Sequence, residues 1–389
     1  MNGKVPGAWE NCPRIETQFV GTKKEGKLIL GIGVSEEAGK LMKALGVKRA
    51  LVVADRFMAQ NGTAEGVRLS LLEEGIESCI FHEITGEPTE ETVYAALSAA
   101  GEGCDGVLGL GGGSAMDVAK LSAVCLKERV SPDDVLSLDG KTLDALPLLL
   151  MPTTAGTGSE VSPYAVFTLH GQKKFLTAPA IYPTVALVDP ALAETLPPDA
   201  TAYTALDALT HGIEGCCGKS NPITMAFASE CARRIFHALP IAFADGSRLD
   251  ARYDLACAAV LGMMAYTQGG GLYAHSMSYL LPMLPHGKGC ALALPYTMAM
   301  NGEKIGPVTD MLEKAVGCEK GGFPEALRAL IAHCGLPGTL KEIGIPEEKK
   351  AEIAAALLER YPRKNNPLAY TLQDAEKLVS AMYAGTVEI

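Results

Sequence analysis

Short aliphatic runs alternate with segments of helical periodicity along the first half of the chain. The aliphatic runs predict strands over residues 27–30, 50–54, 78–82 and 106–110. The other segments, whose apolar residues recur at helical spacing, predict helices over residues 35–45, 65–74, 89–100 and 115–126. Alternation of this kind is typical of βαβ units, so the first half predicts a mostly parallel sheet.

The second half has a different pattern, because after about residue 190 the helical periodicity continues while the strand-like runs stop. Helices are predicted over residues 201–215, 224–239, 251–266, 323–333, 347–360 and 372–383. Pro-rich joints separate several of them. We therefore expect an α/β, Rossmann-like domain over residues 1–190 and an all-α domain over residues 191–389. The junction of two such domains is a favoured place for a ligand cleft.

Composition and charge narrow the class of protein. Hydrophobic residues make up 48% and charged residues 20% of the 389 positions, which is typical of a folded globular chain. The net charge is −11 and no basic cluster exceeds a pair, which argues against DNA or RNA as a partner. A small anionic ligand stays compatible, since backbone N–H groups bind phosphate without lysine or arginine.

Neither a membrane segment nor an export signal is expected. The most apolar stretch, residues 145–151, is far shorter than the roughly 20 residues that span a bilayer. Residues 1–10 carry Pro, Gly and an early acid in place of an apolar signal core. Eleven scattered cysteines without a Cys-x-x-Cys pair indicate reduced thiols, so the sequence predicts a cytoplasmic protein.

A glycine-rich turn follows the predicted strand 106–110. Because Gly111, Gly112 and Gly113 have no Cβ, the backbone there can turn sharply and lie against a ligand. We expect Ser114 to start the next helix, with Asp117 completing a capping box. The positive end of that helix suits a pyrophosphate. A tight turn with an ordinary cap is the alternative, and the pattern is not the G-x-G-x-x-G fingerprint.

A second loop rich in glycine and hydroxyl groups favours a dinucleotide over a lone phosphate. Residues 151–160, Met-Pro-Thr-Thr-Ala-Gly-Thr-Gly-Ser-Glu, hold four hydroxyls and two glycines directly after an apolar run. Such a loop offers hydrogen-bond donors to phosphate or ribose, although a generic Ser/Thr turn would have the same composition. Asp55 closes the strand 51–55, where an acid accepts hydrogen bonds from ribose and repels a 2′-phosphate. A surface acid that starts a turn is the alternative for Asp55.

Four residues of the second half are candidate metal ligands. Asp207 and His211 lie four positions apart, which on a helix places them on one face and close enough to share a cation. A buried Asp–His hydrogen bond is the alternative for this pair alone. Two of the chain's seven histidines, His275 and His286, follow in the same apolar, glycine-punctuated half. One carboxylate and three imidazoles suit Fe²⁺ or Zn²⁺ equally, so the residues do not choose between these ions.

These motifs together resemble the iron-containing (group III) alcohol dehydrogenase family. The matching stretches, in the family's order, are residues 111–120, 152–160, 207–214 and 285–287. The resemblance runs from about residue 20 to the C-terminus. It implies the fold shared with dehydroquinate synthase and the reversible, NAD(P)-linked oxidation of a small primary alcohol to an aldehyde. It also implies a metal, Fe²⁺ with Zn²⁺ compatible, and a homodimer or higher homo-oligomer.

The resemblance also assigns roles to individual residues. The positions that correspond to metal ligands are Asp207, His211, His275 and His286. Those of the pyrophosphate loop are Gly112, Gly113 and Ser114, with Asp117 approaching the nicotinamide end. Thr153 and Thr154 fall on the adenosine side, and Ser159 and Lys174 nearer the ribose and nicotinamide. Asp55 falls where an acid favours NAD over NADP.

The chain departs from the family at two places. Family members often carry a second histidine one turn after the third ligand, and here that position is Tyr279, a candidate proton-relay residue or a core tyrosine. The segment from His275 to His286 is also a few residues shorter. Strand-like segments at residues 19–20 and 28–30 are candidates for pairing across a dimer contact.

Three other functions compete with this interpretation. A metal-free enzyme like maleylacetate reductase would share the nucleotide motifs, but the three histidines and Asp207 argue against it. A lyase related to dehydroquinate synthase would need a basic pocket, and no matching Lys/Arg cluster is present. A non-catalytic nucleotide-binding scaffold or sensor would differ from the enzyme in failing to consume NADH.

Overall fold

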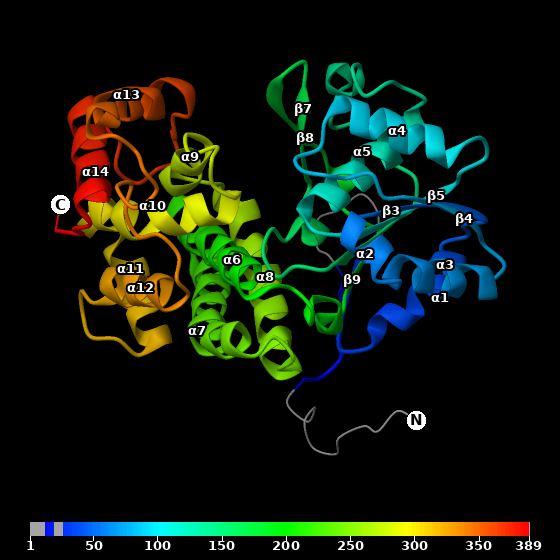
Figure 1. The fold of residues 1–389 in the computed structure, drawn as a ribbon, viewed down its shortest axis with the longest axis horizontal. Coiled ribbons are helices and arrows are strands. Elements are labelled where there is room, and N and C mark those ends of the chain that lie inside the picture. Colours follow the sequence, from blue (N-terminus) through cyan, green and yellow to red (C-terminus); the bar gives the residue numbers. More distant parts are fainter. Residues whose placement is uncertain (1–11, 19–25, 389) are drawn as a thin grey trace. The chain divides into compact units, whose positions relative to one another are not determined.

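The computed structural model describes residues 12–18 and 26–388, which fold into two compact units (Figure 1). The boundary falls between Glu194 and Thr195, except that Ala155–Thr157 belongs with the second unit. The first unit is α/β and the second is helical, as the hydrophobic pattern predicts. Residues 1–11 and 19–20, which entered the expectations on export and dimer pairing, lie outside the described residues.

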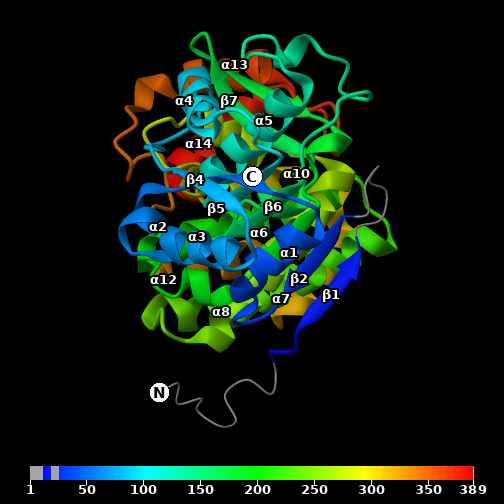
Figure 2. The ribbon, with the colours of Figure 1, turned by 90° about the vertical axis from the view of Figure 1, so that its right-hand side faces the viewer.

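The first unit is built on a seven-stranded sheet of order β1-β2-β9-β6-β5-β3-β4. Its strands are β1 (Ile15–Gln18), β2 (Lys27–Leu30), β3 (Arg49–Ala54), β4 (Glu77–Phe81), β5 (Gly106–Gly111), β6 (Leu148–Pro152) and β9 (Val185–Val188). Every pairing is parallel except that of β1 with β2, which lie side by side at one edge (Figure 2). The central strands are aliphatic along their whole length because both faces of the sheet are covered.

Helices cover this sheet on both faces. They are α1 (Ala38–Ala44), α2 (Arg56–Gln60), α3 (Thr63–Glu73), α4 (Glu90–Ala100) and α5 (Gly113–Glu128). Successive residues of β3 point to opposite faces: Leu51 and Val53 pack in the cluster formed with α4 and α5, and Val52 in the cluster formed with α1 and α3. The sheet is therefore the buried middle layer of the unit, and polar residues can lie at the ends of its strands.

A two-stranded hairpin that the sequence pattern did not predict completes the first unit. It pairs β7 (Tyr164–Leu169) with β8 (Gln172–Thr177) in antiparallel register. Its turn places His170 and Gly171 in the left-handed region, with φ of 51° and 71°. The inner side of β7 is buried against α5, the helix that follows the glycine-rich turn.

The second unit consists of packed helices. They are α6 (Pro198–Gly218), α7 (Pro222–Ala244), α8 (Leu249–Gly269), α9 (Tyr273–Tyr279), α10 (His286–Asn301), α11 (Gly306–Val316), α12 (Phe323–His333), α13 (Lys350–Arg360) and α14 (Leu372–Ala384). Helix α6 is buried along most of its length, so its polar residues lie inside the unit. The helices over 273–279, 286–301 and 306–316 were not predicted from the sequence pattern.

No single helix among residues 12–18 and 26–388 has both the length and the apolar character needed to cross a membrane. The bent pair α8 and α9, which meet at 101°, satisfies that requirement only when the two are taken together.

Candidate functional site

The carboxyl edge of the parallel sheet forms the first candidate site. From β3 the chain runs to β4 on one side and then returns to β5 on the other, so the strand order reverses between β3 and β5. Ligands of open α/β sheets bind outside the carboxyl ends of the strands at such a reversal point. Asp55 follows β3 at this place, and Gly111 ends β5 beside it.

The glycine turn brings the backbone close to Asp55. Gly111 has a φ of 153°, and a Cβ at this position would lie 2.8 Å from the Asp55 Oδ2 atom. Asp55 itself caps α2, since its Oδ1 accepts a hydrogen bond from the Met58 backbone N–H at 2.9 Å. An added side chain at Gly111 would therefore collide with the carboxylate that ends the neighbouring strand.

The predicted capping box at Ser114 and Asp117 is wrong. Helix α5 begins one residue earlier, at Gly113, with Gly112 as its N-cap and with no side-chain cap among the described residues. The first N–H groups of α5 are thus not used by a capping side chain, which is the condition for binding an anion at a helix N-terminus. Ser114 lies in this first turn, inside the helix.

Two threonines that follow β6 lie beside the glycine turn. The Thr153 backbone N–H donates to the Gly111 carbonyl at 3.1 Å. The Thr154 side chain lies 3.7 Å from the position that a Cβ of Gly112 would take. The structure therefore gathers five predicted cofactor residues at one edge: Asp55, Gly111, Gly112, Thr153 and Thr154.

Asp117 and Ser159 are brought together in the interior of the first unit. The Ser159 hydroxyl donates to Asp117 Oδ1 at 2.9 Å, and the Val166 N–H donates to Oδ2 at 3.0 Å. Burial raises the pKa of Asp117. These contacts connect α5 with β7 and with the short turn at residues 159–161. Lys174 lies on β8, where its ammonium group donates to Gln172 at 2.8 Å.

A buried lysine that sequence reasoning missed lies next to this pair. Lys120, one turn after Asp117 on α5, donates to the Ser162 carbonyl at 3.0 Å and to the Tyr164 carbonyl at 2.6 Å. Burial lowers its pKa to about 8, and burial raises the pKa of Glu160 to about 7. The loop after residue 158 is thus held by buried polar groups as well as by apolar contacts.

The second candidate site is a group of side chains inside the helical unit. Asp207 on α6, His275 on α9, and His286 and Cys290 on α10 place their ligand atoms within 4.8 Å of one another. The start of α10 can approach α6 because residue 287 is glycine: a Cβ there would lie 2.2 Å from the Tyr203 carbonyl oxygen. This approach places His286 Nε2 at 3.7 Å from Asp207 Oδ1.

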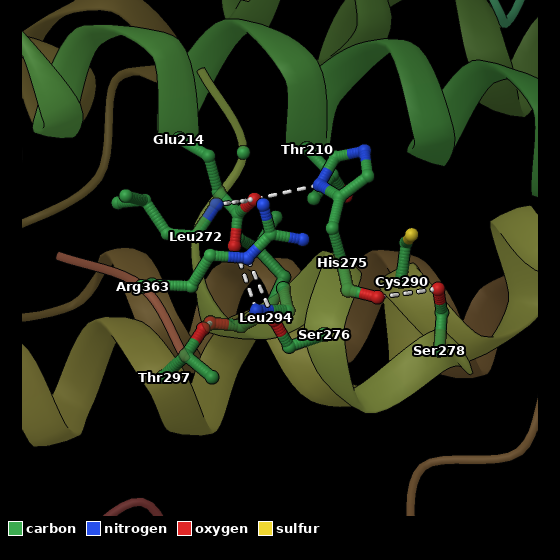
Figure 3. Close-up of polar contacts among 12 residues, drawn as sticks. Thr210, Glu214, Leu272, His275, Ser276, Ser278, Cys290, Leu294, Thr297 and Arg363 are labelled. Carbon is green, nitrogen blue, oxygen red and sulfur yellow. Dashed lines mark hydrogen bonds and ion pairs between the residues drawn. The ribbon is translucent and has the colours of Figure 1, made fainter. Parts of the chain in front are cut away.

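Glu214 sets the orientation of the His275 ring. Its carboxylate accepts hydrogen bonds from the Leu272 N–H at 2.6 Å, the Ala274 N–H at 2.7 Å and His275 Nδ1 at 2.6 Å (Figure 3). Because Nδ1 donates to the carboxylate, the lone pair of the neutral ring is on Nε2. That Nε2 atom is buried and has no hydrogen-bond partner among residues 12–18 and 26–388. Burial also lowers the pKa of His275 well below its usual value, so the ring is neutral.

Ser278 fixes the second ring in the same way. Its hydroxyl donates to the His275 carbonyl at 2.8 Å, and so it accepts from His286 Nδ1 at 2.9 Å. The lone pair of His286 is therefore on Nε2, the atom that faces Asp207 and lies 3.6 Å from the Cys290 sulfur. Both imidazoles thus present an unprotonated Nε2 to the group, which is the form in which histidine binds a metal.

His211 lies next to this group without being one of its members. Its ring centroid is 4.8 Å from that of His275 and 4.8 Å from that of Tyr266. Burial lowers the pKa of His211 to about 4, although a hydrogen bond with the Gly156 backbone opposes the shift. Its Nδ1 atom is buried and has no hydrogen-bond partner in the part of the chain that the structure describes. His211 as a ligand stays a prediction, since the structure places its ring beside His275 and not among the converging atoms.

Tyr279 lies at the end of α9, with its ring stacked on that of His286 at 5.5 Å between centroids. Burial raises the pKa of Tyr279, so its hydroxyl keeps its proton. This places a hydroxyl-bearing ring against a candidate ligand, and the relay role stays a prediction.

Two residues of the helical site were missed in the sequence. Glu214 lies seven positions after Asp207 and three after His211, so its spacing already placed it on their face of α6. Cys290 lies one turn after His286, but it could be related to Asp207 only once α10 was known to lie against α6.

The helical site has the donor set of a metal centre. Three buried polar atoms have no partner within the described part of the chain: Asp207 Oδ1, His211 Nδ1 and His275 Nε2. Burying such atoms without compensation costs about 1–3 kcal/mol each. All three are lone-pair donors, so a divalent cation satisfies them together where another hydrogen-bond acceptor would not.

Comparison with known proteins identifies the class. Residues 25–190 match the family described as iron-containing alcohol dehydrogenase, and residues 201–383 match the C-terminal part of the Fe-containing alcohol dehydrogenase family. The chain belongs to the iron-containing alcohol dehydrogenase family. The expected fold class is thereby confirmed, and so is the expected oxidoreductase class, an NAD(P)-linked alcohol dehydrogenase or aldehyde reductase.

Individual relatives cover nearly the whole chain. The long-chain-alcohol dehydrogenase 1 of Geobacillus thermodenitrificans is 32% identical over 92% of this chain and 95% of its own length. The NAD-dependent methanol dehydrogenase of Bacillus methanolicus is 30% identical over 90% and 96%.

Solved structures agree with this result. A 1,3-propanediol oxidoreductase has a TM-score of 0.84 at 29% identity, covering 95% of this chain and 100% of that one. The sulfoacetaldehyde reductase from Bifidobacterium kashiwanohense, solved in complex with NAD⁺, has a TM-score of 0.85 at 27% identity, covering 92% and 97%.

Proposed function

We propose that the chain catalyses reversible hydride transfer between a small primary alcohol and its aldehyde, with NAD as the preferred cofactor and a divalent metal in the helical unit. The observation that carries the proposal is the convergence of Asp207, His275 and His286, with both imidazole Nε2 atoms unprotonated. His211 is the proposed fourth ligand, because its ring lies beside that of His275 and its buried Nδ1 has no partner among the residues that the structure describes.

The first unit binds the dinucleotide in this proposal. The uncapped start of α5 binds the pyrophosphate, and Thr153 and Thr154 lie beside it. Asp55 accepts the ribose hydroxyls and repels a 2′-phosphate, which favours NAD over NADP. The relatives from B. methanolicus and B. kashiwanohense support this preference by their descriptions. Residues 1–190 carry the cofactor and residues 191–389 carry the metal and substrate.

The second unit prepares the substrate. A bound divalent cation supplies a Lewis acid that lowers the pKa of the substrate hydroxyl. Glu214 and Ser278 hold the two imidazoles in the binding tautomer, and the burial of Asp207 and His275 excludes water from the ligands. Tyr279, stacked on His286, is the proposed proton-relay residue. The hydride chemistry itself belongs to the nicotinamide.

The direct test is to reload the purified protein with Fe²⁺ or Zn²⁺ and to follow NADH consumption with a panel of small aldehydes. We expect turnover with NADH and weaker turnover with NADPH. His211→Ala should lose metal and activity together and still bind NADH. A loaded enzyme that consumes no NADH with any small aldehyde would refute the proposal in favour of a scaffold or sensor. An empty metal site with turnover would instead indicate the metal-free reductase.

Assembly and location complete the proposal. We propose a homodimer or larger homo-oligomer in the cytoplasm, with no nucleic-acid partner, on the basis of the family resemblance, the acidic charge and the cysteine pattern. Size-exclusion chromatography with light scattering tests the assembly.

A further inference from the structure

Cys290 lies among the converging ligand atoms. Its side chain is fully buried, one helical turn after His286 on α10, and its sulfur is 3.6 Å from His286 Nε2. The sulfur also lies within 4.8 Å of the ligand atoms of Asp207 and His275. Figure 3 shows Cys290 beside the His275 side chain. Residues four apart on a helix share a face, so the backbone that positions His286 positions this thiol as well.

The hydrogen-bond inventory of the group gives an independent indication of a cation. Asp207 Oδ1 and His275 Nε2 are both lone-pair atoms, and both are buried without a hydrogen-bond partner among the described residues. His286 Nε2 is a lone-pair atom too, because its Nδ1 donates to Ser278. Of the four converging atoms, Asp207 Oδ1, His275 Nε2, His286 Nε2 and Cys290 Sγ, the sulfur is the one that carries a proton. A divalent cation satisfies several such acceptors at once, whereas the single weak donor in the group cannot.

We propose that Cys290 is a sulfur ligand of the metal, and that it makes the site prefer Zn²⁺ over Fe²⁺. The inference rests on the proposed function and specifies its metal. When the ion binds, the sulfur lone pair forms the bond and the thiol proton passes to solvent, with no change of oxidation state. Thiolate is a soft ligand that favours zinc, whereas carboxylate and imidazole alone accept either ion. A mixed set of thiolate and imidazole is also found in catalytic zinc sites.

Cobalt substitution tests the bond directly. Co²⁺ bound to a thiolate shows a sulfur-to-metal charge-transfer band in the near ultraviolet, while its visible ligand-field bands report occupancy whatever the ligands. We expect both features in the cobalt-loaded wild-type protein. Cys290→Ser should lose the charge-transfer band and keep the ligand-field bands. Cys334→Ser, which removes another buried thiol of the helical unit, should keep both.

Metal competition supplies the second measurement. After anaerobic loading from equal Zn²⁺ and Fe²⁺, elemental analysis should find zinc favoured in the wild type. In Cys290→Ser the zinc-to-iron ratio should fall, because a serine oxygen lacks the soft character by which thiolate favours zinc. If the serine variant does not fold, Cys290→Ala replaces it in both measurements. The cobalt spectrum of the wild type alone still shows whether a sulfur ligand is present.

Ligand-field bands without charge transfer in the wild type would overturn the inference and leave the proposed function standing. A charge-transfer band that survives in both Cys290 variants would also overturn the inference and leave the proposed function standing, because the sulfur would then belong to another residue. A wild-type protein that takes up no cobalt, zinc or iron would overturn the inference and the proposed metal centre together, and NADH turnover measured on the same sample would show whether the reaction also fails.

Discussion

Replacing Glu214 by glutamine should weaken metal binding through His275 without touching a ligand. The wild-type carboxylate is buried and accepts three N–H groups, two from the backbone and one from His275. A glutamine has one oxygen and one NH₂ group in their place. If the NH₂ group replaces Oε2, it meets His275 Nδ1 and drives the ring proton to Nε2, the metal-binding atom. If it replaces Oε1, it meets the Ala274 N–H instead.

The structure sets the size of the effect. In either orientation at least one buried N–H loses its acceptor, which costs about 1–3 kcal/mol of unfolding free energy. Loss of a partner that orients a ligating histidine typically weakens metal binding by about 10–100-fold. That range corresponds to roughly 1.4–2.7 kcal/mol of binding free energy. Glu214→Asp keeps the charge and shortens the side chain, so it should fall between wild type and glutamine.

Chelator competition measures the metal affinity, and urea unfolding of the metal-free proteins measures stability. Glu313→Gln is the matched control, because Glu313 is also a buried carboxylate that accepts a backbone N–H, from Gly321. It should keep its metal affinity, whatever the change in its stability. If Glu214→Gln binds metal as tightly as wild type, or no more weakly than the Glu313 variant, the orienting role of Glu214 is refuted.

Three predictions concern the first unit. Asp55→Asn keeps an oxygen that caps α2 and removes the negative charge. It should raise the NADPH-to-NADH ratio of kcat/KM by roughly tenfold, because a charge repulsion of about 1.4 kcal/mol is removed. An unchanged ratio would contradict the ribose role. Gly111→Ala should raise the KM for NADH and lower the melting temperature, since its Cβ would lie 2.8 Å from the carboxylate of Asp55; unchanged kinetics would contradict the cofactor role. Burial raises the pKa of Glu160 from 4.5 to about 7, so between these values the native state holds a proton that the unfolded chain has lost, and stability falls as pH rises. Glu160→Gln should flatten that slope, which is worth at most about 3.4 kcal/mol, in melting curves taken across the window.

The parts of the fold that the sequence predicts well are those where one local signal suffices. Strands such as β3 and β5 are aliphatic throughout because they are buried on both faces, and this marks them without knowledge of their neighbours. The glycine turn at 111–113 was also predicted from a local signal, three consecutive residues that have no Cβ. The start of α5 was misplaced because Ser114 and Asp117 fit a capping box, whereas Asp117 is used by Ser159 and Val166 on distant segments.

The missing parts of the metal site depend on contacts between helices. Asp207 and Glu214 share a helix face, which spacing alone reveals, but the role of Glu214 depends on α9 bringing His275 to its oxygens. Cys290 looked like one of many reduced thiols until α10 was placed against α6. The candidate ligands were therefore predictable from the sequence, and the contacts across helices that involve Glu214 and Cys290 were not.

The convergence of α6, α9 and α10 on one set of lone pairs has a consequence for the lifetime of the protein. An ion that binds the folded site and not the unfolded chain adds a free energy of RT ln(1 + [M]/Kd) to the native state. Occupancy by metal thus protects these helices from proteolysis as well as enabling chemistry. Scarcity of the ion would then have two effects. It would first lower the fraction of enzyme that is active, and it would afterwards lower the amount of protein, because the metal-free form is degraded faster.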